Sequence, residues 1–208
     1  MAAKNTNKQA SKFLYYFAIA LLIVSLAVFF VNVDKFFRIT GKATSTGTAN
    51  LTIESITNIN FTTNNINWGS GAVTAGQANA TLDTAKGANN VTRGNWTGNT
   101  AGLVVENIGN QNVTLLIKAG LNAATLLGGT NPSYMFNFSN PEANSCTFNS
   151  STTAGTYYTA NNTDRQVCDT FDINQNSDTL RIDMQLVIPS NSKTGAIGDI
   201  ITVTATAV

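Results

Sequence analysis

Five oxygen-bearing side chains alternate along one segment and could bind a cation. They occupy positions one, three, five, seven and twelve, as Asp172, Asn174, Asn176, Asp178 and Asp183. Hard cations such as Ca²⁺ take several oxygen ligands at this spacing, although Ser177 stands at the sixth position, where glycine is usual. The alternative is a hairpin turn, because Asn and Asp side chains readily bond their own backbone. The pattern favours the turn, and Ca²⁺ is the one cofactor that the sequence suggests.

Few other residues could perform catalysis. The chain contains no histidine, so it can form neither a Ser–His or Cys–His pair nor an imidazole metal ligand. Paired carboxylates stay possible as a general acid and base, but no nucleophile elbow, phosphate loop or dinucleotide fingerprint is present. The sequence therefore predicts a protein that is not an enzyme.

The chain after residue 48 is rich in Asn-x-Ser/Thr sequons, which are glycan acceptors in exported proteins. Asn131 is excluded because Pro132 follows it. Since the chain is rich in Asn, Ser and Thr, compositional accident is the alternative at any single site. The sequons predict a glycoprotein domain outside the cell. The candidate glycosylation sites are Asn50, Asn60, Asn79, Asn90, Asn95, Asn112, Asn137, Asn149 and Asn161.

The two cysteines, Cys146 and Cys168, lie in the same sequon-rich region. A cysteine pair in an exported domain favours a disulfide, which here would close a loop of about 20 residues and contribute ~3 kcal/mol of stability. Two unpaired buried thiols are the alternative. No Cys-x-x-Cys spacing indicates a metal or redox centre.

A long apolar segment precedes this region. From Phe13 to Val33 the chain carries no charge, and a helix of that length covers roughly 30 Å, the thickness of a hydrocarbon core. The segment is apolar on every side, so it needs a non-aqueous environment all round. A cleavable secretory signal, with small residues at Gly41-Lys42-Ala43, is the alternative, but its apolar region is usually shorter. Three basic residues on each side leave the orientation undecided by charge.

Beyond the helix the sequence predicts β-structure. Leu180, Ile182 and Met184 alternate with polar residues, which indicates a strand with one core face and one solvent face. The stretch Asn107-Ile108-Gly109-Asn110, between two apolar runs, predicts a hairpin. Roughly eight or nine short strands are expected, and they favour one antiparallel, Ig-like β-sandwich.

The predicted organisation has four parts. Residues 1–12 form a basic leader, and residues 13–33 form a hydrophobic helix that spans a membrane or lies in a filament core. Residues 34–47 are a junction and linker, and residues 48–208 are an extracellular β-sandwich domain.

Charge is scarce along the whole chain. Charged residues make up 11% and the formal net charge is +1, which is too neutral for a nucleic-acid-binding protein. Asn and Thr take the place of Lys and Glu on the expected solvent faces of the strands. Such surfaces can pack against copies of themselves without burying charge.

A basic leader, an apolar helix and a Thr/Asn-rich β-domain with sequons together resemble archaeal type IV pilins and archaellins. Glu106-Asn107-Ile108-Gly109-Asn110-Gln111-Asn112-Val113-Thr114 and the ending Ile188-Pro-Ser-Asn … Gly198-Asp-Ile-Ile-Thr-Val-Thr resemble archaeal surface β-domains. The resemblance implies that a prepilin peptidase removes the leader immediately before the helix. It also implies a filament with helices in the core and β-domains outside. Lys12, between any such cut and Phe13, departs from the family's pattern.

The sequence thus predicts a structural subunit of an extracellular pilus-like filament. Its partners are copies of itself and, before assembly, the membrane. The alternative is a single-pass, membrane-anchored cell-surface protein, either a surface-layer component or an adhesion module. In a variant of the filament, copies are joined by strand exchange and the segment from Thr48 to Ile56 is donated.

Overall fold

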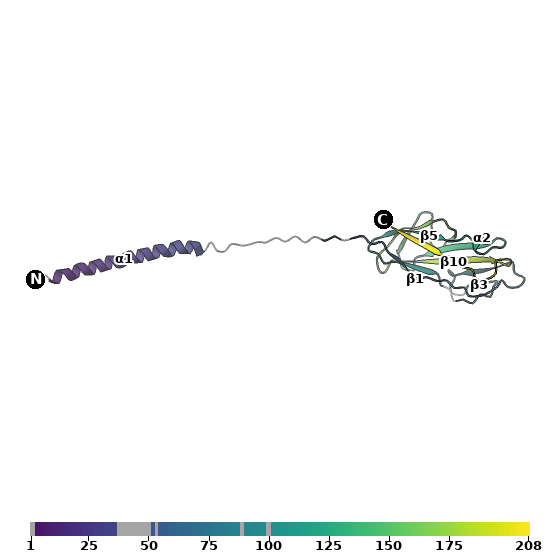
Figure 1. Ribbon diagram of the computed structural model, residues 1–208, viewed down its shortest axis with the longest axis horizontal. Helices are drawn as coiled ribbons and strands as arrows, with labels where there is room; N and C mark the ends of the chain where they lie inside the picture. The colour runs from purple at the N-terminus through teal and green to yellow at the C-terminus, as the bar shows by residue number, and fades with distance from the viewer. Residues whose placement is uncertain (1–2, 37–50, 53, 88–89, 99–100) are drawn as a thin grey trace. The chain divides into compact units, whose positions relative to one another are not determined.

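The computed structural model describes residues 3–36, 51–52, 54–87, 90–98 and 101–208, and within the first range the side chains of residues 11–28. The chain divides into two compact units, Met1–Thr52 and Ile53–Val208. Figure 1 shows a helix in the first unit and a β-rich fold in the second. Asn50 and the part of the predicted junction after residue 36 lie outside the described residues.

The first unit contains α1, which runs from Ala3 to Phe36. The predicted apolar helix is confirmed, and it begins well before Phe13. Most of the predicted leader therefore belongs to the same helix. Its sequence favours this extension, because it contains no Gly or Pro and is rich in Ala, Lys and other good helix formers.

The second unit is a mostly β domain with antiparallel sheets, as predicted. Among the described residues, one sheet has seven strands and the other has four. A single helical turn, α2 (Ala123–Leu126), begins after Asn122, whose side chain accepts a hydrogen bond from the Thr125 N–H. The strands are β1 (Ile59–Thr63), β2 (Asn79–Asp83), β3 (Val91–Thr92), β4 (Leu103–Asn107), β5 (Val113–Ala119), β6 (Ser133–Ser139), β7 (Cys146–Phe148), β8 (Tyr157–Thr159), β9 (Arg165–Phe171), β10 (Thr179–Pro189) and β11 (Ile201–Ala207).

The seven-stranded sheet is built around β10, its longest strand. One edge of β10 pairs with β6 over Arg181–Val187. The other edge has two successive partners: β4 pairs with Thr179–Ile182, and β2 pairs with Gln185–Pro189. Asp183 and Met184 therefore lie where one partner strand ends and the next begins.

The four-stranded sheet has the order β11-β5-β9-β7. Alternate residues of β5 are buried, which is the pattern of a strand with one face on a core. Val113 and Leu115 of this sheet belong to the same buried cluster as Leu180 and Ile182 of the larger sheet. One hydrophobic core thus serves both sheets.

The prediction of a hairpin at residues 107–110 is wrong. This segment joins β4 to β5, and those strands belong to different sheets. The Asn107 side chain explains the geometry, because its Nδ2 donates to the Gln111 and Phe171 carbonyls while its Oδ1 accepts from the Gly109 N–H. The hydrogen bonds of Asn107 therefore stabilise a connection between the two sheets rather than a turn between two neighbouring strands.

Candidate functional site

The most distinctive surface of the chain is the apolar surface of α1. Within Ser11–Val28 the helix is long and apolar enough to cross a membrane, and none of this window is buried. The large side chains along it are between 39% and 71% exposed. They are Phe13, Leu14, Tyr15, Tyr16, Phe17, Ile19, Leu21, Leu22, Ile23, Val24, Leu26 and Val28.

Such a surface is unstable in water. Burying one large apolar side chain contributes about 1.5–3 kcal/mol, so covering this surface would contribute on the order of 20 kcal/mol. The residues are distributed on all sides of the helix rather than along one stripe, and a single flat partner would therefore leave many of them exposed. The chemistry of α1 fits a surrounding environment, which lipid or a bundle of helices could provide.

The sequons differ in how accessible the structure leaves them. Asn60 and Asn95 are exposed, whereas Asn137, in β6, is only 5% exposed and has little room for a glycan. The Asn149 Nδ2, the atom that would carry a sugar, donates to Asp169 Oδ1 at 2.6 Å. The remaining described candidates are partly exposed: Asn79, Asn90, Asn112 and Asn161.

Cys146 and Cys168 form a disulfide, with 5.4 Å between their Cα atoms. Cys146 lies in β7 and Cys168 in β9, and these strands pair in the four-stranded sheet. The bond therefore fastens the short edge strand β7 to a central strand. No free cysteine is present among the described residues.

The segment that begins at Asp172 is held by hydrogen bonds to its own backbone N–H groups. Asp172 Oδ1 accepts from the N–H groups of Ile173 and Asn174, at 2.7 and 3.3 Å. The Ser177 N–H donates to the Asn174 carbonyl at 2.6 Å, and the Asn174 side chain accepts from the Asn176 N–H. Among the described residues, no group of three or more His, Cys, Asp and Glu side chains is placed to hold a metal ion.

Asp178 is buried beside two other carboxylates. Its backbone N–H donates to Glu142 Oε2 at 3.0 Å, and its neighbour Thr179 pairs with Glu106 across β4 and β10. Burial raises the pKa of Asp178 above its ordinary value of 3.8, and the negative charges of Glu106 and Glu142 raise it further. Calcium in this segment stays a prediction.

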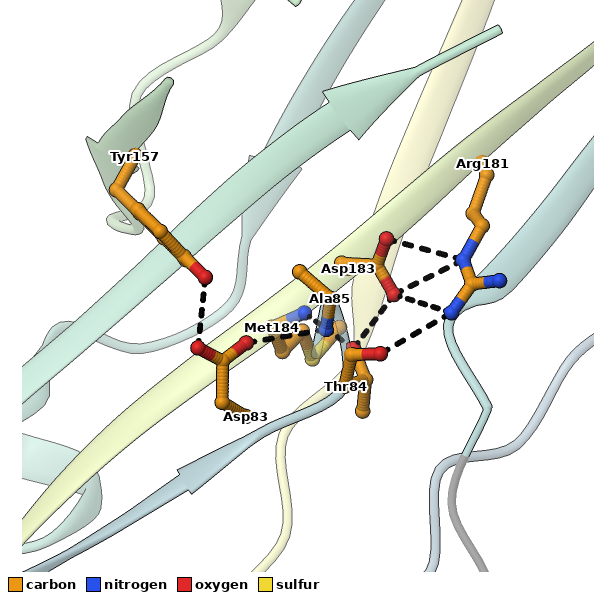
Figure 2. A network of polar contacts seen from close by, with 7 residues as sticks. All are labelled: Asp83, Thr84, Ala85, Tyr157, Arg181, Asp183 and Met184. Atoms are coloured by element: carbon orange, nitrogen blue, oxygen red, sulfur yellow. Dashed lines mark hydrogen bonds and ion pairs between the residues drawn. The ribbon is translucent and has the colours of Figure 1, made fainter. Parts of the chain in front are cut away.

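Asp183 lies away from that segment, in a buried polar network that the sequence pattern did not indicate (Figure 2). The Arg181 guanidinium donates to both Asp183 oxygens, at 2.9–3.0 Å. The Thr84 hydroxyl donates to Asp183 Oδ1 at 2.8 Å and accepts from the Met184 N–H at 2.9 Å. The expected solvent face of β10 is thus buried at Asp183, which is 3% exposed.

A second buried carboxylate, Asp83, lies beside this network. Tyr157 donates its hydroxyl proton to Asp83 Oδ2 at 2.7 Å, and Gln185 donates to the same oxygen at 3.0 Å. Burial raises the pKa of Tyr157 well above its ordinary value, and the hydrogen bond to Asp83 adds to the effect. The phenol therefore stays protonated and keeps donating, which fits a structural role.

One polar hollow of about 270 Å³ opens near β9. Arg165 lies over the Tyr158 ring at 4.2 Å and donates to the Ser151 carbonyl at 3.4 Å. The hollow is smaller than most small-molecule sites, and its wall carries Asp164 and Arg165 side by side in sequence. Its lining is mostly polar, with Ile117 and Phe136 as the apolar residues.

No protein-family model matches this chain, and comparison with curated proteins and with solved structures likewise yields no match.

Proposed function

We propose that this chain is a structural subunit of an extracellular pilus-like filament. The apolar helices of many copies pack together in the filament core, and the β-domains face the solvent. The proposal rests on the apolar surface of α1, because Ser11–Val28 is 0% buried within the chain. Copies of the same helix would cover that surface on every side.

The composition of the β-domain supports the same proposal. Its exposed strand residues are largely Thr and Asn, and the described residues hold only three ion pairs. Neutral surfaces of this kind can be brought together in an assembly without the desolvation cost of buried charge. Glycans on the exposed sequons, such as Asn60 and Asn95, would face outward.

We also infer that the two sheets pack face to face as a sandwich. The shared core cluster, with side chains from both sheets, supports this arrangement. The Ig-like form of the sandwich stays a prediction.

A membrane-anchored surface protein is the second candidate, and one observation favours it. The uncharged segment from Phe13 to Val33 is bounded by Lys12 on one side and by Asp34 and Lys35 on the other. Tyr15 and Tyr16 stand near one end of the window and are 66% and 68% exposed. Aromatic and charged residues at the ends of an apolar helix suit the two headgroup regions of a bilayer.

Shearing separates the two functions. A filament subunit should leave sheared cells as long assemblies that sediment apart from membranes and are visible by electron microscopy. An anchored protein should stay with the membrane fraction and dissolve only in detergent. Recovery of the chain solely with membranes, and no filament containing it, would refute the filament proposal.

A matched pair of variants tests the role of the helix. Leu22→Glu places a charge in the middle of the apolar window, whereas Thr194→Glu adds the same charge at an exposed position of the β-domain. We expect L22E to abolish filaments, because an unpaired charge in a helix bundle is costly, and T194E to assemble normally. Normal filaments from L22E would contradict the proposal.

N-terminal sequencing of the mature protein adds an independent result. A start near Ser11 fits a pilin-like subunit, and a start at Met1 fits an anchored protein. A start near Thr44 would mean that the helix is removed as a secretory signal, and it would exclude both functions.

A further inference from the structure

Strand β11 is an open edge of the four-stranded sheet. In the described part of the chain its strand partner is β5, and the register runs without interruption from Ile201↔Ala119 to Ala207↔Val113. Figure 1 shows β11, in yellow, ending at the C-terminus. One side of β11 is therefore fully paired, and no strand among the described residues pairs with the backbone groups of its other side.

The hydrogen bonds at the two ends of β11 show which groups face outward. The Ile200 carbonyl accepts from the Gly120 N–H, and the Val208 N–H donates to the Asn112 carbonyl. In an antiparallel pair the N–H and C=O of one residue point to the same side, and the side alternates along the strand. The even-numbered residues thus bond β5. The outward groups belong to Ile201, Val203, Ala205 and Ala207.

This edge lacks the features that usually protect an edge strand. Natural proteins place charges, Pro or bulges there, or keep the strand very short. The β11 sequence ITVTATA has no charge and no Pro, and its pairing with β5 has no bulge. The other edge strands of the described domain differ: β3, β7 and β8 have two or three residues, and β1 has an irregularity between Phe61 and Thr63.

We propose that β11 pairs with β11 of a second copy, antiparallel and centred on Thr204. In this register Ile201 faces Ala207 and Val203 faces Ala205 of the second copy, so every outward N–H and C=O is paired. The side chains also match. The apolar residues align on one face, where Ile201, Val203 and Ala205 are half-buried and Ala207 is exposed. On the other, exposed face Thr202 aligns with Thr206, and Thr204 with its own copy.

The contact is separate from the proposed filament function. A two-fold contact uses the same surface on both copies and closes at two, whereas the contacts that propagate a filament do not close. The pair would therefore join two β-domains whether the helix lies in a filament core or in lipid. Failure of the pair would leave the filament proposal intact, and the reverse also holds.

Cysteine cross-linking on the full-length protein tests the pairing and its register. Because the native cysteines are bonded to each other, an introduced cysteine is the single free thiol of the described residues. Thr204→Cys would place two thiols opposite each other, with Cα atoms about 4.5 Å apart, within the range for a disulfide. We expect oxidation to give a covalent dimer on a non-reducing gel.

Thr202→Cys is the matched control, because Thr202 is as exposed as Thr204 but faces Thr206. Its two thiols would lie about 13 Å apart along the strands, too far for a disulfide. We expect no dimer from T202C alone and a dimer from the double variant T202C/T206C. Equal dimer yields from T204C and T202C would overturn the proposal.

A charge at the two-fold axis provides a second test. Adding Thr204→Lys to T202C/T206C would place like charges opposite each other, and we expect a dimer yield roughly fivefold lower. Thr204→Ser in the same background should retain the dimer. The proposal would also be overturned if the T204C thiol reacted fully with a soluble reagent but gave no dimer. The edge of β11 would then be open or paired with another partner.

Discussion

At the scale of single residues, Thr84 makes the backbone hydrogen bonds that the topology of β10 leaves unmade. Two strands, β4 and β2, share one edge of β10, and on that edge neither strand bonds the Met184 N–H and C=O, which lie between them. Thr84 provides both missing bonds, since its N–H donates to the Met184 carbonyl and its hydroxyl accepts from the Met184 N–H. The same hydroxyl donates to Asp183, so the backbone gap and the buried carboxylate are satisfied together.

Replacing Thr84 by valine tests this role. Thr84→Val keeps the shape of the side chain but leaves the buried Met184 N–H without its acceptor, so we expect a loss of about 2–3 kcal/mol in the free energy of unfolding. Thr84→Ser retains the hydroxyl and should lose much less. Urea denaturation of the two variants gives the comparison, and equal losses would mean that the methyl group matters rather than the hydroxyl.

Asp178 should make the stability of the β-domain depend on pH. Its folded-state pKa is raised above 3.8, so the folded state binds the proton more tightly than the unfolded state does. Ionisation thus destabilises the fold, and stability falls as pH rises from the unfolded-state pKa through the raised folded-state pKa. We expect Asp178→Asn to raise Tm near pH 7 and to leave it unchanged near pH 3, where both forms are neutral.

The Glu142→Gln variant serves as the comparison for Asp178→Asn. It removes one of the charges that raise the Asp178 pKa and keeps an oxygen that can accept from the Asp178 N–H. Its gain in Tm near pH 7 should be smaller, because burial is the largest cause of the shift. A gain from D178N that persisted undiminished near pH 3 would contradict the argument.

At the scale of elements, the disulfide should matter through β7. This strand has three residues and pairs only with β9 among the described strands, so little besides the bond holds it. Closing a loop of this length contributes about 3 kcal/mol by chain entropy. We expect the double variant Cys146→Ser/Cys168→Ser to lose about that amount in thermal or urea unfolding.

Reduction of the wild-type protein provides the control for the two serines. If the stability comes from the cross-link, dithiothreitol should lower the wild-type Tm to near that of the double variant and should leave the variant unchanged. A variant that unfolds at the wild-type temperature would show that β7 is held by its ladder to β9 alone.

The helix and the strands could be predicted because they depend on local periodicity. The alternating Tyr134, Phe136 and Phe138 are buried in β6 as a period of two requires, and the uncharged segment from Phe13 is helical. The connection between β4 and β5 could not be predicted in this way. The Asn107–Asn110 stretch has the residues of a hairpin turn. Which strand follows it in space depends on a contact distant in sequence, the hydrogen bond from Asn107 to the Phe171 carbonyl.

The buried network of β10 was beyond sequence reasoning for the same reason. Arg181 and Asp183 alternate with apolar residues and therefore resemble the solvent face of a strand. Asp183 is buried because Thr84, about a hundred positions earlier in the chain, lies against it at the gap between β4 and β2. A long strand with two charged residues two positions apart is the one signal that could have suggested an internal pair.

At the scale of the whole molecule, the two units have different requirements. The core cluster is formed entirely by described residues of the second unit, so the β-domain has what it needs to fold alone. We expect a fragment of residues 51–208 to be soluble and to unfold within about 2 °C of the β-domain transition in the full chain, because the loss of α1 removes no part of that core.

A shorter fragment, residues 59–208, tests where the domain begins. It lacks six hydrogen bonds between residues 54–58 and residues 108–111, and in two of them the Asn110 and Ile108 N–H groups donate to the carbonyls of Ile56 and Asn58. Losing these two backbone bonds alone costs about 2 kcal/mol, which for a domain of this size lowers Tm by at least roughly 4–8 °C. Calorimetry of both fragments measures the difference. If the two fragments had the same Tm, residues 54–58 would be dispensable to the domain and free to be donated to a neighbouring copy. A lower Tm for the shorter fragment would place these residues in the fold of their own chain.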